Sequence, residues 1–351
     1  MMLQGHFIDT LLAIEYRDPD NIAYSTWLYF RGITAPVFFT ISGLIFTYLL
    51  IKAKEKGTLS MRIRKGLVRG LMLIGIGYAL RIPIFRWLTG NFGTYFMVID
   101  VLQCIGLSLI LIVCIYLLAR KKTLMFSVVM LCLGTLIFLC EPLYRTYSAE
   151  GIPLFFANYL TKVNGSVFTI FPWFGYMTFG AFIATLFNRY LGKPKFKTII
   201  VTGFFVAGIL LVYQSTNLLL WLSTVFEYSL FSEVANFNYL FIRLGNVLMI
   251  FGFFYAIEIY LKHPTILKIG QRTLSIYVIH FVLLYGSFTG LGLNQILGKN
   301  LTPFEAVFGA ICFLIAVSLV SIYLIKANTN MYKHIIDRLH YLKSLIKSLN
   351  N

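Results

Sequence analysis

A histidine and an aspartate stand three residues apart in the apolar segment that opens the chain, at His6 and Asp9. Residues at this spacing share one face of a helix. A neutral imidazole held by a carboxylate is a common general base near neutral pH, because the carboxylate orients the ring and stabilises its protonated form. No serine or cysteine lies nearby in sequence. We therefore predict that His6 directly deprotonates a hydroxyl or amine and that Asp9 orients it.

Further ionisable residues interrupt or border apolar segments. Ionisable side chains are costly in a membrane and are candidate functional residues for that reason. Each also has a structural interpretation: an interfacial arginine can extend toward water, a nearby Arg and Asp can pair, and a histidine can be part of the core. The residues concerned are Arg31, Arg81, Asp100, Arg243 and His280.

A basic run lies at the entrance to the third apolar segment. Guanidinium groups bind phosphates in a bidentate manner, so these residues predict a site for the phosphates of coenzyme A. The alternative is the ordinary excess of basic residues on the cytoplasmic side of a membrane protein. The run consists of Arg62, Arg64, Lys65 and Arg69.

The elements that position these residues are apolar blocks separated by short basic runs. Of the 351 residues, 59% are hydrophobic and 12% are charged, which excludes an ordinary soluble protein, and the basic runs are too short to indicate nucleic-acid binding. We predict an all-α, polytopic membrane helix bundle with about ten spans, the first of them incomplete: it is either a half-span or, as we favour, part of a longer helix that starts upstream. The predicted spans are 1–13, 31–52, 66–88, 97–118, 124–140, 167–188, 198–215, 239–261, 273–289 and 304–325.

The charge distribution predicts the topology. Most of the 30 basic residues fall on one side of the predicted spans and most of the 13 acidic residues on the other, so the basic side is predicted to be cytoplasmic. Residues 1–325 then form one transmembrane domain in a plasma (inner) membrane. The tail 326–351 is a basic amphipathic helix on the inner leaflet. Long connections at 14–30, 141–166 and 216–238 face outward.

Several chemistries lack their motifs. The five cysteines show no C-x-x-C spacing, which argues against a zinc site or a disulfide framework, and we expect no metal. There is no Walker A sequence and no H-E-x-x-H motif. These absences argue against an ATP-driven pump and a zinc protease.

Five short motifs resemble those of the transmembrane acyltransferases, and most of all the bacterial relatives of heparan-alpha-glucosaminide N-acetyltransferase. The chain is also similar to acyltransferase family three, which O-acylates surface polysaccharides. The resemblance implies transfer of an acyl group from cytoplasmic acyl-CoA to a sugar on the far side, with His6 at the catalytic histidine position. The motifs are Met2–His6, Arg31–Gly43, Asp100–Gly106, Phe171–Gly175 and Leu274–His280.

The leading hypothesis is thus a membrane acyltransferase that uses acetyl-CoA or another acyl-CoA and acts on a carbohydrate or glycolipid, with a homodimer left open. A transporter or flippase for a polar or lipid-linked solute is the main alternative, although no internal repeat supports it. A non-catalytic scaffold is the third. The residues predicted to bind substrate are Arg31, Arg81, Asp100, Gln103, Trp173, Arg243 and His280.

Overall fold

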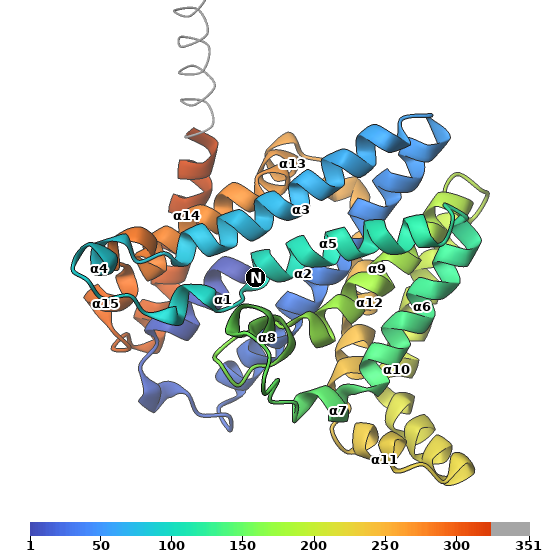
Figure 1. Ribbon diagram of the computed structural model, residues 1–351, viewed down its shortest axis with the longest axis horizontal. Helices are drawn as coiled ribbons and strands as arrows, with labels where there is room; N and C mark the ends of the chain where they lie inside the picture. Colours follow the sequence, from blue (N-terminus) through green and yellow to red (C-terminus); the bar gives the residue numbers. More distant parts are fainter. Residues whose placement is uncertain (324–351) are drawn as a thin grey trace, which may run out of the picture. The chain divides into compact units, whose positions relative to one another are not determined.

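The computed structural model describes residues 1–323, and within this range it is helical without a β-strand (Figure 1). The predicted tail 326–351 lies outside the described residues. The helices are α1 (Met2–Leu11), α2 (Ile22–Glu55), α3 (Leu59–Arg81), α4 (Ile84–Leu88), α5 (Val101–Leu118), α6 (Thr123–Leu139), α7 (Glu141–Arg145), α8 (Leu154–Leu160), α9 (Ile170–Tyr190), α10 (Phe196–Phe226), α11 (Ser229–Asn236), α12 (Tyr239–Ala256), α13 (Pro264–Gln271), α14 (Thr273–Tyr285), α15 (Leu293–Leu297) and a helix at Pro303–Tyr323.

Six helices of the described chain are long and apolar enough to cross a membrane, against the ten spans predicted. A seventh span results if α13 and α14, which meet at a 65° bend, are taken together. The protein is therefore an all-helical membrane protein. The six are Ile22–Glu55, Thr94–Leu118, Ile170–Tyr190, Phe196–Phe226, Tyr239–Ala256 and Pro303–Tyr323.

Several predicted helix ends were wrong, among them the start of α3, which lies at Leu59 and not at residue 66. The helix α2 begins at Ile22 instead of residue 31, because the Asn21 side chain accepts hydrogen bonds from the amides of Ala23 and Tyr24 and so caps the helix. As a result, Arg31 lies inside a helix and does not begin one. The helix α3 ends at Arg81, two residues before Pro83, because a proline disfavours helical geometry in the residue before it.

A further error concerns the predicted outward connection 216–238. This segment is mostly helical, because α10 continues without interruption to Phe226 and α11 follows it at Ser229–Asn236.

The chain forms two compact units. One unit combines Met1–Asp18 with the chain from Tyr260 onward, and the other is Pro19–Ile259. The first unit thus joins residues from both ends of the described chain, whereas the second is one continuous segment.

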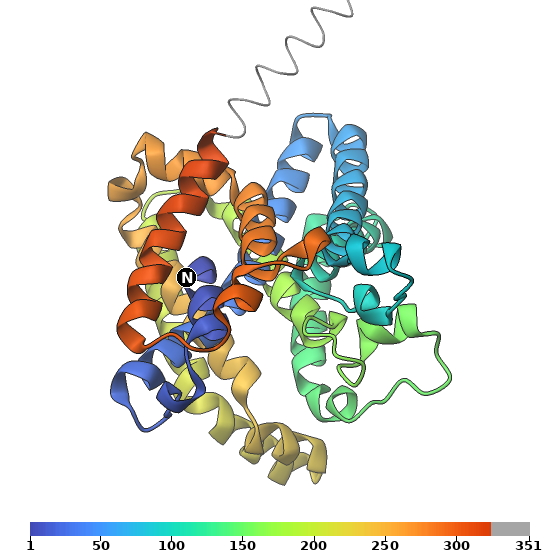
Figure 2. The ribbon, with the colours of Figure 1, turned by 90° about the vertical axis from the view of Figure 1, so that its left-hand side faces the viewer.

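Within the first unit, α1 lies beside the Pro303–Tyr323 helix (Figure 2). The rings of Phe7 and Phe313 are 5.2 Å apart, and Phe7 also occupies the space that a side chain at Gly309 would need. The chain after α1 is held by two backbone hydrogen bonds of 3.0 Å, one from the Ala13 amide to the Leu301 carbonyl and one from the Leu301 amide to the Leu11 carbonyl. These contacts fix the position of α1 and its side chains.

Within the second unit, glycines allow close approach of helices at two crossings that matter for the site. A Cβ atom at Gly180 of α9 would collide with the Thr40 carbonyl of α2. A Cβ atom at Gly106 of α5 would lie 2.5 Å from the Gly70 carbonyl of α3. Helix packing in membranes relies on such small residues because lipid supplies no hydrophobic driving force between helices.

Candidate functional site

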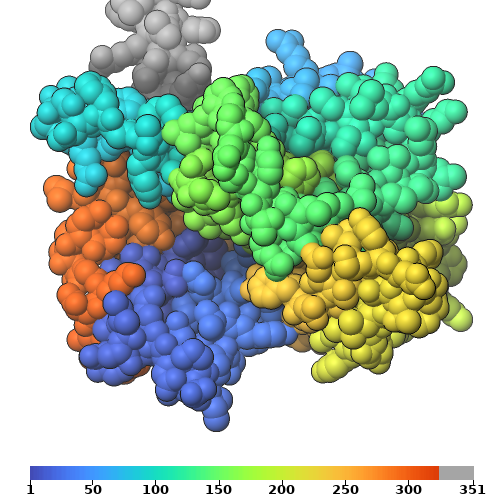
Figure 3. All heavy atoms as spheres, turned by 60° about the horizontal axis from the view of Figure 1, so that its bottom comes forward, coloured from blue at the N-terminus to red at the C-terminus, as the bar shows by residue number. Residues whose placement is uncertain are grey.

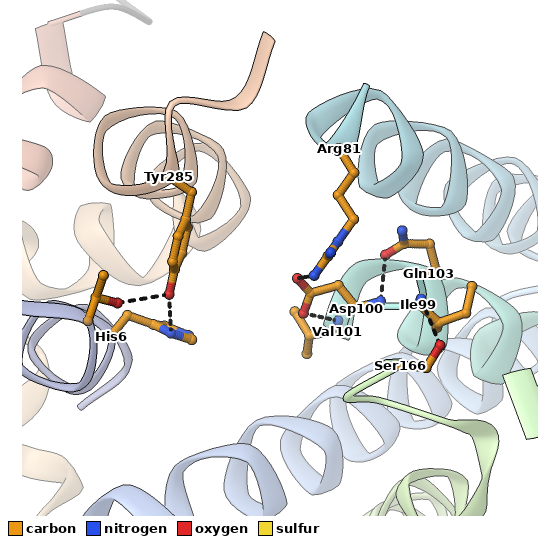
Figure 4. A network of polar contacts seen from close by, with 9 residues as sticks. His6, Arg81, Ile99, Asp100, Val101, Gln103, Ser166 and Tyr285 are labelled. Carbon is orange, nitrogen blue, oxygen red and sulfur yellow. Dashed lines mark hydrogen bonds and ion pairs between the residues drawn. The ribbon is translucent and has the colours of Figure 1, made fainter. Parts of the chain in front are cut away.

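The first unit places His6 in contact with side chains of α14. The Tyr285 hydroxyl lies 3.2 Å from His6 Nδ1 and 3.3 Å from the Thr10 hydroxyl, and Figure 4 shows the Tyr285 ring pointing at His6. The fully buried His280 ring lies 5.2 Å from the His6 ring, centroid to centroid, at an interplanar angle of 30°. The structure therefore brings together two histidines that are far apart in the sequence.

Asp9, the predicted orienting residue, lies three residues after His6 on α1 and is half-buried. Its main-chain carbonyl accepts a 2.8 Å hydrogen bond from the Arg17 guanidinium, which also binds the Leu12 carbonyl. These bonds cap the end of α1. The role of Asp9 in orienting His6 stays a prediction.

Arg81 and Asp100 in the second unit form the ion pair that their positions in the sequence suggested. Arg81 Nη2 donates to Asp100 Oδ2 at 2.8 Å, and the Arg81 side chain is only 8% exposed (Figure 4). The other Asp100 oxygen accepts from the Val101 amide, and Gln103 Oε1 accepts from the Asp100 amide at 3.2 Å. The N-terminus of α5 is thereby capped and tied to the end of α3. A role of these three residues in substrate binding stays a prediction.

Trp173 belongs to an aromatic cluster. Its ring lies 5.1 Å from Phe39 and 4.8 Å from Phe168, and its Nε1 is buried without a hydrogen-bond partner in the described part of the chain. The Arg31 guanidinium lies 6.0 Å from the Trp27 ring. The role in substrate binding predicted for Trp173 and Arg31 stays a prediction.

Arg243 belongs to a group of polar residues that we call the Glu141 cluster: Glu141, Arg145, Lys162, Tyr239 and Arg243. Glu141 is 3% exposed and pairs with Arg145 at 3.4 Å, and the Arg243 guanidinium lies 5.3 Å from the Tyr239 ring. The cluster draws on α7, α12 and the segment after α8. Figure 3 shows the green segment that contains α7 and α8 beside the yellow α10–α11 region.

The electrostatics of this cluster depend on burial. Burial raises the pKa of Glu141, and Arg145 and Lys162 oppose this effect. Burial lowers the pKa of Lys162. The charge of Glu141 raises this pKa, and the charge of Arg243 lowers it further. Sequence analysis identified only Arg243 in this group. Glu141 gave a usable signal, since a lone acidic residue directly follows an apolar block.

We expect Glu141→Gln to stabilise the protein at neutral and alkaline pH. A folded-state pKa above the ordinary 4.5 means that folding favours the protonated carboxyl, so the contribution of Glu141 to stability falls as pH rises from about 4.5 through the raised folded-state value. Glutamine mimics the neutral form at every pH. The melting temperature (Tm) in detergent should therefore rise by roughly 2–4 °C at pH 8 and not at pH 4.

The matched control for this measurement is Glu233→Gln, which removes an exposed carboxylate on α11. A Tm that falls at pH 8 on changing Glu141 would contradict the prediction and would show that the ion pair outweighs burial.

The four basic residues predicted to bind phosphate all lie in the first half of α3. At 100° per residue, Arg62, Lys65 and Arg69 border the face of α3 that packs against α5, and Arg64 lies on the opposite side. We call these three residues the basic stripe. Arg62 Nε is buried and has no hydrogen-bond partner among residues 1–323, and its guanidinium lies 5.8 Å from the Phe46 ring.

A model of the family described as "Heparan-alpha-glucosaminide N-acetyltransferase, catalytic" matches residues 1–226, well over half of the chain. The match includes His6, the basic stripe and the Arg81–Asp100 pair, and it ends where α10 ends. Arg243, His280 and Tyr285 follow it. No curated protein and no solved structure matches the chain.

Proposed function

This chain belongs to the family of the heparan-alpha-glucosaminide N-acetyltransferase catalytic domain, and on that basis we propose that it transfers an acetyl group from cytoplasmic acetyl-CoA to a sugar or glycan on the external side of the plasma (inner) membrane. One observation supports this assignment beyond family membership. His6, on a helix fixed at its end by backbone hydrogen bonds, has its Nδ1 atom against the Tyr285 hydroxyl.

The reaction that we propose is a direct transfer. His6 Nε2 removes the proton from an amine or hydroxyl of the acceptor, whose electron pair attacks the thioester carbonyl carbon of acetyl-CoA. The carbon–sulfur bond then breaks, and the proton held by His6 passes to the departing thiolate, so that free coenzyme A and the acetylated acceptor leave. Such proton transfer by a positioned side chain contributes about 10²–10⁴-fold to the rate.

The two substrates have different recognition chemistry. The basic stripe binds the phosphates of coenzyme A, since the buried Arg62 Nε lacks a protein partner in the described chain and phosphate oxygens accept from guanidinium groups. Arg243, with the rest of the Glu141 cluster, binds the acceptor through charged hydrogen bonds. The connections rich in basic residues face the cytoplasm, because cytoplasmic loops of membrane proteins carry an excess of Lys and Arg.

The donor is tested by the thermal stability of the detergent-purified protein with acetyl-CoA. A ligand at about 100 times its dissociation constant adds ~2.7 kcal/mol to the free energy of unfolding, which raises the Tm by several degrees. We expect Arg62→Gln and Arg69→Gln to abolish this increase. Arg64→Gln should retain it, because Arg64 lies on the other side of α3.

The control Arg64→Gln removes the same charge at the same level of the helix, so it separates a phosphate site from the general effect of basic charge. No stabilisation of the folded protein by acetyl-CoA would contradict the proposal and would favour the transporter or flippase. Equal losses in all three variants would contradict the assignment of the stripe.

A further inference from the structure

The Tyr285 hydroxyl contacts two side chains on one face of α1. It lies 3.2 Å from His6 Nδ1 and 3.3 Å from Thr10 Oγ1, and these residues are four positions apart, one helical turn. Tyr285 is the last residue of α14, and its ring packs against Phe281 at 5.0 Å. The hydroxyl therefore sits between a titratable ring and a second hydroxyl.

A phenol has one proton to donate, so the direction of these two bonds decides which nitrogen of His6 carries its proton. If Tyr285 donates to His6 Nδ1, the neutral ring carries its proton on Nε2, which then has no lone pair for a base. If Tyr285 donates to Thr10, its oxygen accepts from Nδ1–H, and the lone pair is on Nε2. Only the second arrangement makes Nε2 a base.

The proposed function requires the second arrangement. His6 Nδ1 lies against the Tyr285 hydroxyl, so a base that acts on the acceptor must use Nε2. The neutral ring has a lone pair on Nε2 only when Nδ1 carries the proton, and Tyr285 then donates its own proton to Thr10.

We propose that Thr10 and Tyr285 are positioning residues that hold His6 as the Nδ1–H tautomer and thereby make Nε2 the general base. This inference rests on the proposed function, because it concerns the same histidine. The His280 ring on α14 also lies against the His6 ring, and Asp9 precedes Thr10 on α1. Thr10 acts only through Tyr285.

The test compares Thr10→Val with Thr10→Ser in acetyl transfer to the amine or hydroxyl acceptor that the wild-type protein uses. Valine has the shape of threonine without the hydroxyl, so Tyr285 loses its acceptor and turns its proton to Nδ1. We expect kcat to fall by roughly 10- to 100-fold, a part of the ~10²–10⁴-fold that general base catalysis contributes. Serine restores the acceptor and the rate. The KM for acetyl-CoA should not change.

A double variant separates this role from independent packing effects. In Tyr285→Phe the hydroxyl is absent, so Thr10→Val has nothing further to misdirect. The rate of the double variant should therefore equal that of Tyr285→Phe, whereas independent losses would multiply. Tyr285→Phe is nearly isosteric and tests the proposal if Thr10→Val does not fold, as judged by its Tm.

Two outcomes would overturn the proposal. One is a wild-type rate in Thr10→Val or Tyr285→Phe while His6→Ala is inactive, which leaves the proposed function intact. The other is multiplicative losses in the double variant. Activity in His6→Ala contradicts the proposed function instead, so the two failures are distinguishable.

Discussion

Acetyl transfer is expected to fall by about 10²–10⁴-fold in the His6→Ala variant, which is the contribution of a positioned general base. The variant removes the only group that we assign to proton transfer from the acceptor, and leaves unchanged the basic stripe that we propose to bind the donor. Its Tm should still rise with acetyl-CoA. The measurement is initial rate at saturating acetyl-CoA, together with that Tm.

His263→Ala is the matched control for His6→Ala. His263 is exposed, and its Nδ1 accepts from the Thr265 amide at 3.3 Å at the start of α13. Its loss removes a helix cap, at a cost of about 1 kcal/mol, without touching the proposed site. Rates should be at the wild-type level. Transfer at the wild-type rate in His6→Ala would remove His6 from the mechanism.

The second large effect concerns folding. Gly180→Ala should lower the Tm of the protein in detergent by several degrees, because its Cβ atom would collide with the Thr40 carbonyl and lie 2.9 Å from the Leu44 amide nitrogen. Both atoms belong to the backbone of α2, so no side chain can rotate away. The helices must separate, and overpacking of this kind costs about 1–3 kcal/mol or more against a total stability of roughly 5–15 kcal/mol.

Gly203→Ala on α10 is the matched control, because it shows whether alanine at a glycine without close neighbours also destabilises the protein. A Cβ atom at Gly203 meets no heavy atom within 4 Å, so alanine should stabilise the helix by about 0.5–1 kcal/mol. The readout is the fraction of monodisperse protein in size-exclusion chromatography and its Tm. Equal Tm values in the two variants would show that the α2–α9 crossing does not depend on Gly180.

Apolar periodicity predicted where helices form better than where they end. Each predicted span overlaps a helix of the structure, because runs of apolar residues are helical in lipid. The start of α2 depends on the Asn21 cap, and α10 continues through residues 216–226, an apolar stretch that the prediction placed in a connection. The start of α2 is decided by local hydrogen bonds that hydropathy does not register.

The site was predictable only where its partners are close in sequence. The Arg81–Asp100 pair spans a short connection, and its prediction is confirmed. The contacts of His6 with Tyr285 and His280 join opposite ends of the chain, and they depend on how α1 packs among the last helices. No pattern within one segment encodes such packing. The catalytic role of His6 stays a prediction.

The composition of the first unit has a consequence for biosynthesis. His6 leaves the ribosome before Tyr285, which follows 279 positions later. At about 5–20 residues per second, the two are made roughly 14–56 s apart. Leu301, whose backbone is hydrogen-bonded to that of Leu11 and Ala13, is made later still. The second unit can assemble during this interval, whereas α1 gains its contact with Tyr285 only after Tyr285 has been made.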